Sequence, residues 1–412
     1  MTNLCFYFQV HQPWRLRHYR YVEVGHNHDY FDHDKNAQVM RKVADKCYLP
    51  MNNLLLDLIS DLDGSFKASF SISGVFLQQA EEYAPEVIHS FKRLIETGCV
   101  EVLSETSHHS LTSLFSPEEF VEQVNIHREL CSRLLKTPGK TFRNTELITS
   151  NAIASEVAKM GYRAMLMEGA DRVLGWRSPL FGYHLKNSPN LLMLLKNYRL
   201  SDDIAFRFSD RGWAEWPLTS EKFTHWLKMI ELENPVSAKG QDPFVGLFMD
   251  YETFGEHQWK STGIFDFMRA LPLRLLDTGS VRFVTPSEAA ETMQPSAELD
   301  VHSPVSWADI ERDLSAWVGN PIQDSAIRAI YRLEGAVKKT KDASLIETWR
   351  RLTTSDHFYY MCTKYFADGD VHKYFNPYES PYDAHIYFMN TVADLEQRLG
   401  LAPVEDEERI PA

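Results

Sequence analysis

The sequence predicts an α/β fold in which mostly parallel strands form a barrel and a bundle of helices follows. Short apolar runs alternate with longer segments of helical periodicity, as in repeated strand–helix units. Strands that are mostly buried are typical of a parallel sheet, and so many units favour a barrel. From about residue 300 the strand signals fade and helical patterns follow one another. These patterns cover residues 307–319, 321–339, 344–366 and 382–399.

Runs of β-rich, mostly apolar residues are predicted as strands. They span residues 4–10, 66–72, 99–104, 141–147, 163–168, 191–196, 244–250 and 281–284. Helix start signals lie between some of them. Ser116 and Thr285 each precede a proline and stand three residues before a glutamate, Glu119 and Glu288. This spacing predicts an N-cap with a capping box in both places.

The composition limits the possible partners and compartments. The formal net charge of −14 argues against nucleic acid or an anionic membrane as the main partner, because both attract basic surfaces. No segment approaches the roughly 20 apolar residues that span a bilayer, and the N-terminal apolar run is too short for a signal peptide. The 5 Cys lack CxxC spacing, which favours reduced thiols. We therefore expect a soluble, cytoplasmic protein, and the sequence leaves its oligomeric state open.

Polar residues crowd the ends of several predicted strands. In FVGLFMDYETFGEHQW, residues 244–259, an apolar run stops at an Asp that is followed by Glu and His. Because rigid parallel strands deliver their ends to a shared rim, these groups are expected to gather on one face of the barrel. The strand-end groups are His11 and Trp14; Glu101, Glu105, His108 and His109; Glu146; Asp202 and Asp203; and Asp250, Glu252 and His257.

Two of these carboxylates, Glu146 and Asp250, each terminate a well-formed predicted strand in a polar and aromatic context. Glycoside hydrolysis needs such a pair across a cleft, with one group to attack the anomeric carbon and one to protonate the leaving oxygen. Aromatic residues make up 12% of the chain, and several Trp stand beside hydrogen-bonding residues, which suits the faces and hydroxyls of sugars. The residues alone leave the stereochemical outcome open, because it depends on the carboxyl separation.

A metal site is the competing chemistry. The stretch GHNHDYFDHD, residues 25–34, contains three His and three Asp, and His108 and His109 could join it. The stretch lacks the i, i+4 helical pairing of a zincin, so a polar loop near the cleft is the favoured interpretation. No metal or other cofactor is expected. The sequence also lacks the glycine-rich phosphate and dinucleotide motifs and the GxSxG elbow of serine hydrolases.

Five motifs, taken in order, resemble the sequence signatures of glycoside hydrolase family 57, and in particular of its short α-amylase-type members. They are FQVHQPWRLR, GCVEVLSETSHHSL, FRNTELITSN, FMDYETFGEH and SWADIERDLSAWVGN, and the resemblance runs along most of the chain. It implies an incomplete TIM-like (β/α)7 barrel over residues 1–298. It also implies a C-terminal α-helical bundle over residues 299–412 that contributes to the cleft, and a retaining mechanism on α-glucans.

The resemblance implies roles for individual residues as well. Glu146, in FRNTEL, corresponds to the nucleophile, and Asp250, in FMDYETFGEH, corresponds to the general acid/base. The partner is then an α-glucan or a maltooligosaccharide. From the motifs and strand ends together, the residues expected around the bound sugar are His11, Trp14, Glu101, His109, Asp203, Glu252, His257, Trp307, Asp313 and Trp317.

Other functions remain open at this point. A 4-α-glucanotransferase or a glucan branching enzyme would use the same catalytic pair, and only the acceptor subsites and water access would distinguish it from a hydrolase. A metal-dependent carbohydrate deacetylase and a non-catalytic glucan-binding protein are the less favoured alternatives, because two strand-end carboxylates are intact.

Overall fold

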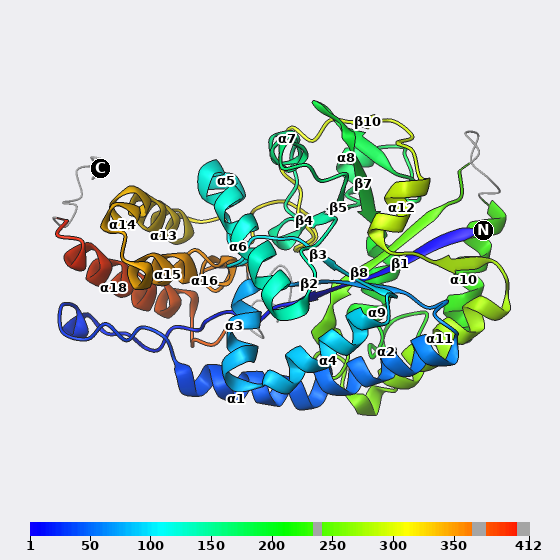
Figure 1. Ribbon diagram of the computed structural model, residues 1–412, viewed down its shortest axis with the longest axis horizontal. Helices are drawn as coiled ribbons and strands as arrows, with labels where there is room; N and C mark the ends of the chain where they lie inside the picture. Colours follow the sequence, from blue (N-terminus) through cyan, green and yellow to red (C-terminus); the bar gives the residue numbers. More distant parts are fainter. Residues whose placement is uncertain (234–240, 365–375, 402–412) are drawn as a thin grey trace.

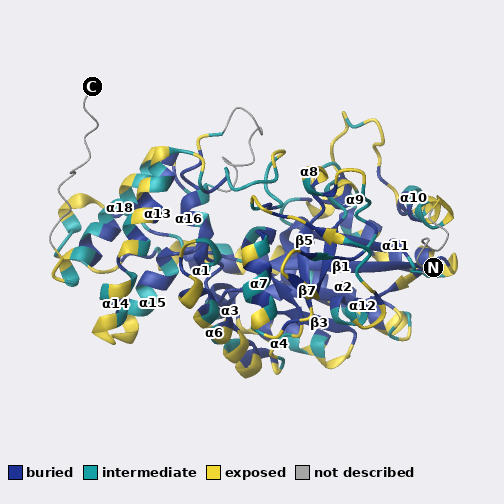
Figure 2. Cartoon of the chain, turned by 90° about the horizontal axis from the view of Figure 1, so that it is seen from above, coloured by how far each residue is buried: buried dark blue, intermediate teal, exposed yellow. Residues whose placement is uncertain are grey.

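The computed structural model describes residues 1–233, 241–364 and 376–401. The strands lie together in one part of the molecule, and the last helices gather at its other end (Figure 1). Strands are the most deeply buried elements, whereas the helices around them turn exposed faces outward (Figure 2). The α/β class and the C-terminal helical part are both as the sequence predicts.

Within these ranges the strands form a single sheet. Their bounds are β1 Thr2–Val10, β2 Ala68–Ile72, β3 Val100–Leu103, β4 Phe142–Arg143, β5 Ala164–Glu168, β6 Tyr183–Leu185, β7 Ser188–Lys196, β8 Phe244–Asp250, β9 Val281–Phe283 and β10 Glu298–Leu299. All eight predicted strands are present, although the predicted strand 141–147 shortens to two residues. The short strands β6 and β10 were not expected from the sequence.

Seven parallel strands close into a ring, in the order β1, β2, β3, β4, β5, β7, β8 and back to β1. The pairing between β1 and β8 is the longest in the ring, and it runs from the residue pair Asn3–Phe244 to the residue pair Gln9–Asp250. Two of the strand pairings consist of a single residue pair. Ser104 pairs with Phe142 between β3 and β4, and Lys196 pairs with Gly246 between β7 and β8. The sheet is therefore a (β/α)7 barrel that is incompletely hydrogen-bonded, and β6, β9 and β10 extend it outside the ring.

Helices cover the outside of the ring. They are α1 His33–Val43, α2 Leu49–Asp61, α3 Gly74–Tyr83, α4 Pro85–Glu96, α5 Thr112–Phe115, α6 Pro117–Leu135, α7 Asn151–Lys159, α8 Asp171–Leu174, α9 Tyr198–Ala205, α10 Ser220–Glu233, α11 Ile264–Asp277 and α12 Pro286–Thr292. Helix α4 shows why they pack there. Its apolar residues recur every three to four positions, so Val87, Phe91 and Leu94 are buried on one face against the core.

The two predicted capping boxes have different outcomes. Thr285 and Glu288 form one, since the Thr285 side chain accepts from the backbone N–H of Glu288 and the Glu288 carboxylate accepts from that of Thr285. Ser116 does cap α6 by accepting from the backbone N–H of Glu119 at 3.3 Å. The carboxylate of Glu119 does not complete the box, because it is paired with Arg350 at 2.7 Å.

The C-terminal helices are α13 Pro321–Arg332, α14 Glu334–Thr340, α15 Ala343–Leu352, α16 Ser355–Tyr359 and α18 Pro381–Arg398. They pack beside α6, where Arg350 and Lys338 both form ion pairs with the fully buried carboxylate of Glu119. The predicted helical domain, residues 299–412, includes residues 365–375 and 402–412, which lie outside the described ranges. Its boundary at residue 298 stays a prediction.

The prediction of a helix over residues 307–319 is wrong. This segment is a series of turns, in which Asp309 and Arg312 adopt left-handed backbone conformations with φ of 55° and 49°. Non-glycine residues avoid these conformations inside helices. The carboxylate of Asp313 accepts from the backbone N–H of Ser315 at 2.8 Å, and such local bonds compete with helix formation.

Two further expectations concern thiols and membranes. All five cysteines lie in the described part of the chain, where all five are buried and none forms a disulfide. Within residues 1–233, 241–364 and 376–401, no helix is both long and apolar enough to cross a membrane.

Candidate active site

Glu146 lies three residues beyond the end of β4, in the 3-10 turn η3 (Thr145–Leu147). Its backbone is left-handed, with φ 55° and ψ 26°, a conformation that costs a non-glycine residue about 1–3 kcal/mol. The surrounding structure holds the turn. The side chain of Asn144 donates to the carbonyl oxygen of Ile148 at 2.8 Å, and the backbone N–H of Trp307 donates to the carbonyl oxygen of Glu146 at 3.2 Å.

Both carboxylate oxygens of Glu146 accept a hydrogen bond. His109 Nε2 donates to Oε1 at 3.1 Å, and Trp307 Nε1 donates to Oε2 at 2.6 Å. Burial acts to raise the pKa of Glu146, but the His109 hydrogen bond and the positive charges of His109 and Arg143 outweigh it and hold the pKa below the usual value. Glu146 is therefore ionised at neutral pH.

Asp250 is the last residue of β8, at the end of a run of buried residues. Its carboxyl group has no side-chain hydrogen bond or ion pair with any residue that the structure describes. Burial and the negative charge of Glu146 raise its pKa to about 6, against the opposing charges of Arg143, Lys196 and His109. The environments of Glu146 and Asp250 thus move the two pKa values apart, as in an acid and a nucleophile that share one site.

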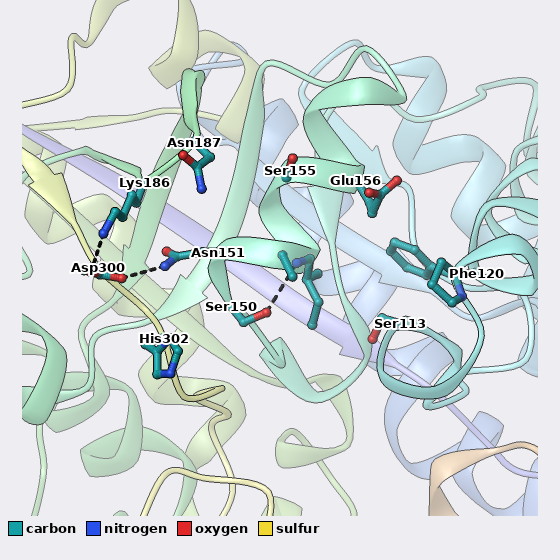
Figure 3. Close-up of a pocket in the computed structure, with 13 residues that line it drawn as sticks. Ser113, Phe120, Ser150, Asn151, Ser155, Glu156, Lys186, Asn187, Asp300 and His302 are labelled. Atoms are coloured by element: carbon teal, nitrogen blue, oxygen red, sulfur yellow. Dashed lines mark hydrogen bonds and ion pairs between the residues drawn. The ribbon is translucent and has the colours of Figure 1, made fainter.

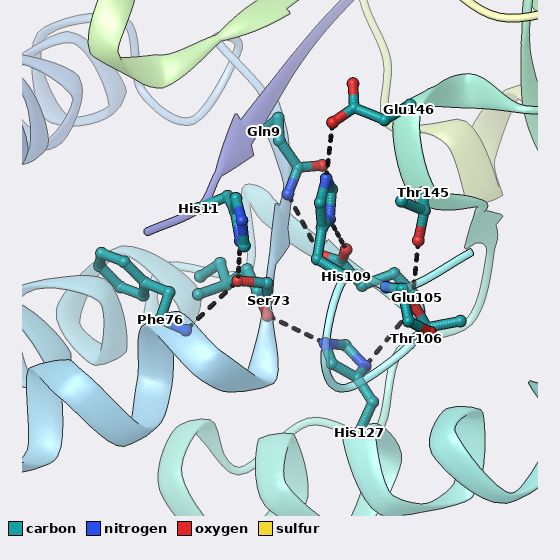
Figure 4. A network of polar contacts seen from close by, with 12 residues as sticks. Gln9, His11, Ser73, Phe76, Glu105, Thr106, His109, His127, Thr145 and Glu146 are labelled. Atoms are coloured by element: carbon teal, nitrogen blue, oxygen red, sulfur yellow. Dashed lines mark hydrogen bonds and ion pairs between the residues drawn. The ribbon is translucent and has the colours of Figure 1, made fainter. Parts of the chain in front are cut away.

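Two stacked histidines lie beside Glu146 (Figure 4). The ring centroids of His11 and His109 are 4.1 Å apart, with an interplanar angle of 24°. His109 contacts the buried carboxylate of Glu105 at 2.8 Å through its other nitrogen. His11 contacts Ser73 at 2.7 Å and Asp356, in α16, at 2.8 Å. A residue of the C-terminal helices therefore reaches the first strand end.

Trp307 connects the turn-rich segment after the barrel to the same site. Besides its two bonds to Glu146, its ring lies 4.8 Å from the guanidinium of Arg143 and 5.3 Å from Nζ of Lys196. Arg143 is fully buried, and its three guanidinium nitrogens have no hydrogen-bond partner in the described part of the chain. The charge of Arg143 favours the ionised forms of both Glu146 and Asp250, and the charge of Lys196 favours that of Asp250.

Lys196 belongs to a second charged cluster, at the ends of β5 and β7. It pairs with Asp202 at 3.2 Å and with Glu168 at 3.7 Å, and Arg312 contacts Asp202 at 3.5 Å. Glu168 is fully buried, and burial raises its pKa to about 7. The cluster fixes the position of Lys196 next to Trp307.

Glu252 and His257 follow Asp250 along the chain. The hydroxyl of Tyr48 donates to Glu252 Oε1 at 2.5 Å, and burial together with the charge of Asp250 raises the Glu252 pKa to about 8. Burial lowers the pKa of His257 to about 4. Both groups are therefore neutral at pH 7, so they can donate or accept hydrogen bonds without adding charge.

Within the described residues, three predicted sugar-binding residues contact groups other than Glu146 and Asp250, and their roles stay predictions. Trp14 is 1% exposed and packs among Phe31, His33 and Tyr83, while its indole N–H donates to Gln78. Glu101 is the second residue of β3, and it accepts from the hydroxyl of Thr141 and the backbone N–H of Ser287. Asp203 forms an ion pair with Arg207 at 2.6 Å, whereas its neighbour Asp202 contacts Lys196.

Two residues of the fifth motif have structural contacts. Asp313 accepts from the backbone and hydroxyl of Ser315 and holds its own loop. Trp317 is 1% exposed and lies in the core, where its ring is 6.2 Å from that of Tyr359. Of this motif, only Trp307 contacts Glu146. A substrate-binding role for Asp313 or Trp317 stays a prediction.

The sequence contains a signal for some of the additional residues. Glu168 and Lys196 are the last residues of predicted strands, so the strand-end argument extends to them directly. Glu105 belongs to a predicted strand-end cluster, but no role was assigned to it there. Asp356 has no such signal, because it lies in a helix 345 residues away from its partner His11.

The metal-site alternative is not supported by the loop over residues 25–34. Three of its groups contact the carboxylate of Asp394 in α18: the backbone N–H of Gly25, the ring of His28 and the hydroxyl of Tyr30. In the described residues no group of three or more His, Cys, Asp or Glu could hold a metal ion. The polar loop attaches the barrel to the last helix.

A cavity of about 650 Å³ lies elsewhere, beside the start of α7 (Figure 3). Asn151 and Lys186 both contact Asp300 in its wall, at 2.6 Å and 3.3 Å. Neither Glu146 nor Asp250 lines it. This cavity therefore does not coincide with the carboxylate pair, and we assign no function to it.

A barrel that carries two strand-end carboxyl groups with opposite pKa shifts is the arrangement that a glycoside hydrolase needs. The chain belongs to glycosyl hydrolase family 57, since the model of that family matches residues 5–302. It is 40% identical over 409 residues to a Methanocaldococcus jannaschii protein named "Putative alpha-amylase", and the match covers 95% of this chain and 84% of that protein.

Solved structures share the fold at low sequence identity. A GH57 branching enzyme from Thermococcus kodakaraensis is 14% identical with a TM-score of 0.72, covering 96% of this chain and 90% of its own. The alpha-amylase AmyC from Thermotoga maritima is 11% identical with a TM-score of 0.64, and the match covers 98% of this chain and 95% of that protein. A 4-alpha-glucanotransferase from Thermococcus litoralis is 15% identical with a TM-score of 0.60, covering 96% and 60%.

Proposed function

We propose that this protein is an α-amylase-type hydrolase that cleaves α-1,4 bonds of glucans with retention of configuration. The observation that carries the proposal is the contrast between Glu146 and Asp250. Glu146 accepts two N–H donors and is held as a carboxylate, whereas Asp250 has a raised pKa and no such donor among the described residues. The 40% identity to a protein named as an alpha-amylase supports the α-glucan as substrate.

In the first step Glu146 attacks the anomeric carbon through one carboxylate oxygen, and the bond from that carbon to the leaving oxygen breaks. Asp250 transfers its proton to the leaving oxygen. Glu146 must start ionised and Asp250 protonated, which is the arrangement that their pKa shifts favour. A β-glycosyl ester on Glu146 results.

In the second step Asp250, now a carboxylate, takes a proton from an incoming water molecule. The oxygen of this water attacks the anomeric carbon, the ester bond breaks, and Glu146 leaves as a carboxylate. The product regains the α-configuration. The ester intermediate removes the charge of Glu146, so Asp250 ionises more easily in this step than in the first.

A transfer reaction is the second candidate, because a branching enzyme and a glucanotransferase share the fold. A sugar hydroxyl would then replace water in the second step, and Glu146 and Asp250 would keep their roles. We propose hydrolysis as the main reaction on the basis of the more similar relative. A neutral substrate also suits a chain with net charge −14. A cytoplasmic location stays a prediction from the five cysteines, none of which forms a disulfide in the described residues.

Incubation with maltoheptaose tests the proposal, with products followed by chromatography and by a reducing-end assay. We expect shorter oligomers and rising reducing ends. Longer oligomers at constant reducing ends would identify a transferase instead. Glu146→Gln should abolish nearly all turnover, whereas Glu156→Gln, a surface change ten positions along the chain, should not. Substantial activity in Glu146→Gln would contradict the assignment of the nucleophile.

A further inference from the structure

We propose that Glu105 is a positioning residue that holds His109 as an imidazolium, with Nε2–H directed at Glu146. Through His109, Glu105 keeps Glu146 ionised and oriented for attack. The inference rests on the proposed function, because it deepens the role of Glu146. It assigns a task to a buried charged group that the two-step mechanism itself does not use.

Glu105 lies two residues beyond β3 and is fully buried. Its Oε2 faces His109 Nδ1 at 2.8 Å, and its Oε1 accepts from the side chain of Gln9, in β1, at 3.2 Å (Figure 4). A carboxylate without solvent is costly unless its oxygens are paired. Gln9 and His109 satisfy one oxygen each, so the charge of Glu105 is directed at the histidine.

The backbone fixes the position of the histidine as well. His109 has φ 49°, in the left-handed region, and its backbone N–H donates to the carbonyl oxygen of Thr106 at 3.1 Å. The hydroxyl of Thr106 contacts that of Thr145 at 2.8 Å, and Thr145 directly precedes Glu146. The turn that contains His109 and the turn that contains Glu146 are therefore connected twice: by the hydrogen bond between His109 and Glu146, and by that between Thr106 and Thr145.

The protonation state follows from this geometry. His109 lies between two carboxylates, Glu105 on Nδ1 and Glu146 on Nε2, and a carboxylate can only accept. Both nitrogens must therefore carry a proton. Burial acts to lower the pKa of His109, but the hydrogen bonds and charges of these two carboxylates raise it to about 9.

The other charged groups around His109 are consistent with a single positive charge on the pair of histidines, carried by His109. Asp356 of α16 contacts His11 at 2.8 Å. The positive charge of Arg143, in β4, acts to lower the pKa values of both Glu105 and Glu146. His11 stacks on the His109 ring, and burial together with the charge of His109 lowers the His11 pKa. A neutral His11 donates from Nε2 to Asp356 and accepts at Nδ1 from Ser73.

During turnover the proton stays on His109. When Glu146 forms the ester it loses its negative charge, and His109 would then be an unpaired buried cation without a second carboxylate. Glu105 supplies that second charge in both steps. Glu146 can thus change charge while the imidazolium remains paired and in place.

The substitution Glu105→Gln removes the negative charge of this side chain and keeps its size and shape. A glutamine amide can accept from Gln9 and donate to His109 Nδ1, which leaves a neutral His109 that still donates from Nε2 to Glu146. Glu105→Asp keeps the charge on a shorter side chain. The matched control is Glu347→Gln, because Glu347 contacts the neighbouring histidine, His108, at 3.3 Å and does not contact Glu146.

The first measurement is the titration of the His109 ring by ¹⁵N NMR, with the His109 signal identified by its loss in His109→Gln. In Glu105→Gln the pKa of His109 should fall by about 1–3 units, the usual effect of removing an adjacent opposite charge. Glu105→Asp and Glu347→Gln should leave it close to that of the original protein. An unchanged titration in Glu105→Gln would overturn the proposal.

The second measurement is the pH profile of kcat/KM on maltoheptaose. In Glu105→Gln the acid limb should move to higher pH, because Glu146 loses the adjacent positive charge, and kcat should fall about tenfold at unchanged KM. Glu105→Asp should recover most of kcat. Equal effects of Glu347→Gln and Glu105→Gln would overturn the proposal. If the unmodified protein converts no glucan, the proposed function fails, while the NMR titration still decides the role of Glu105.

Discussion

Replacing Trp307 with Phe removes the indole N–H that donates to Oε2 of Glu146 over 2.6 Å and keeps an aromatic ring near Arg143 and Lys196. A hydrogen bond to a charged group contributes about 1.5–3 kcal/mol. Because this bond is made to the carboxylate and not to the acid, its loss should raise the Glu146 pKa by about one to two units, at about 1.4 kcal/mol per unit.

The assay is kcat/KM for maltoheptaose as a function of pH. In the proposed mechanism the reactive form of Glu146 is the carboxylate, so the acid limb should move to higher pH by about one to two units in Trp307→Phe. Trp317→Phe is the matched control from the same segment, since the indole N–H of Trp317 has no hydrogen-bond partner in the described residues. An acid limb that stays in place in Trp307→Phe, or that moves equally in both variants, would refute the reasoning.

Other predictions follow from the same contacts. The alkaline limb of kcat/KM should fall near the Asp250 pKa of about 6, because activity is lost as this acid ionises; activity that persists unchanged to pH 9 would contradict an acid role. Asp250→Asn should lose less activity on aryl glycosides with good leaving groups than on maltoheptaose. Glu119→Gln should lower the unfolding free energy by about 3 kcal/mol in chemical denaturation, because it leaves Arg350 and Lys338 without their buried partner. A chelator should leave turnover unchanged.

The strand ends explain how far the sequence could predict the site. Asp250 and Glu146 end or follow buried strands, and a strand end is visible as the point where an apolar run stops. That argument also included Glu101, which lies inside β3, two residues before its end, whereas Glu105 lies two residues beyond the end and contacts His109. Residue spacing cannot distinguish these cases, because the exact length of a short strand depends on its pairing with neighbours.

The turn-rich segment over residues 307–319 shows a different limit. Its apolar residues recur at helical spacing, yet Trp307 and Arg312 contact groups in the barrel, and these tertiary contacts override the local preference. Contacts of this kind join residues more than a hundred positions apart. A single sequence contains no local signal for them.

The catalytic unit does not end with the barrel. Trp307 donates to the proposed nucleophile, Glu146. Asp356 contacts His11, which stacks on His109, the second donor to Glu146. Trp307 and Asp356 both lie beyond the predicted boundary at residue 298. A barrel without the later segment would lose one of the two donors to Glu146 and the carboxylate that orients His11. Glu146 and Asp250 would remain, but the contrast between their environments would weaken. In the proposed mechanism that contrast allows one carboxyl group to attack while the other gives up its proton.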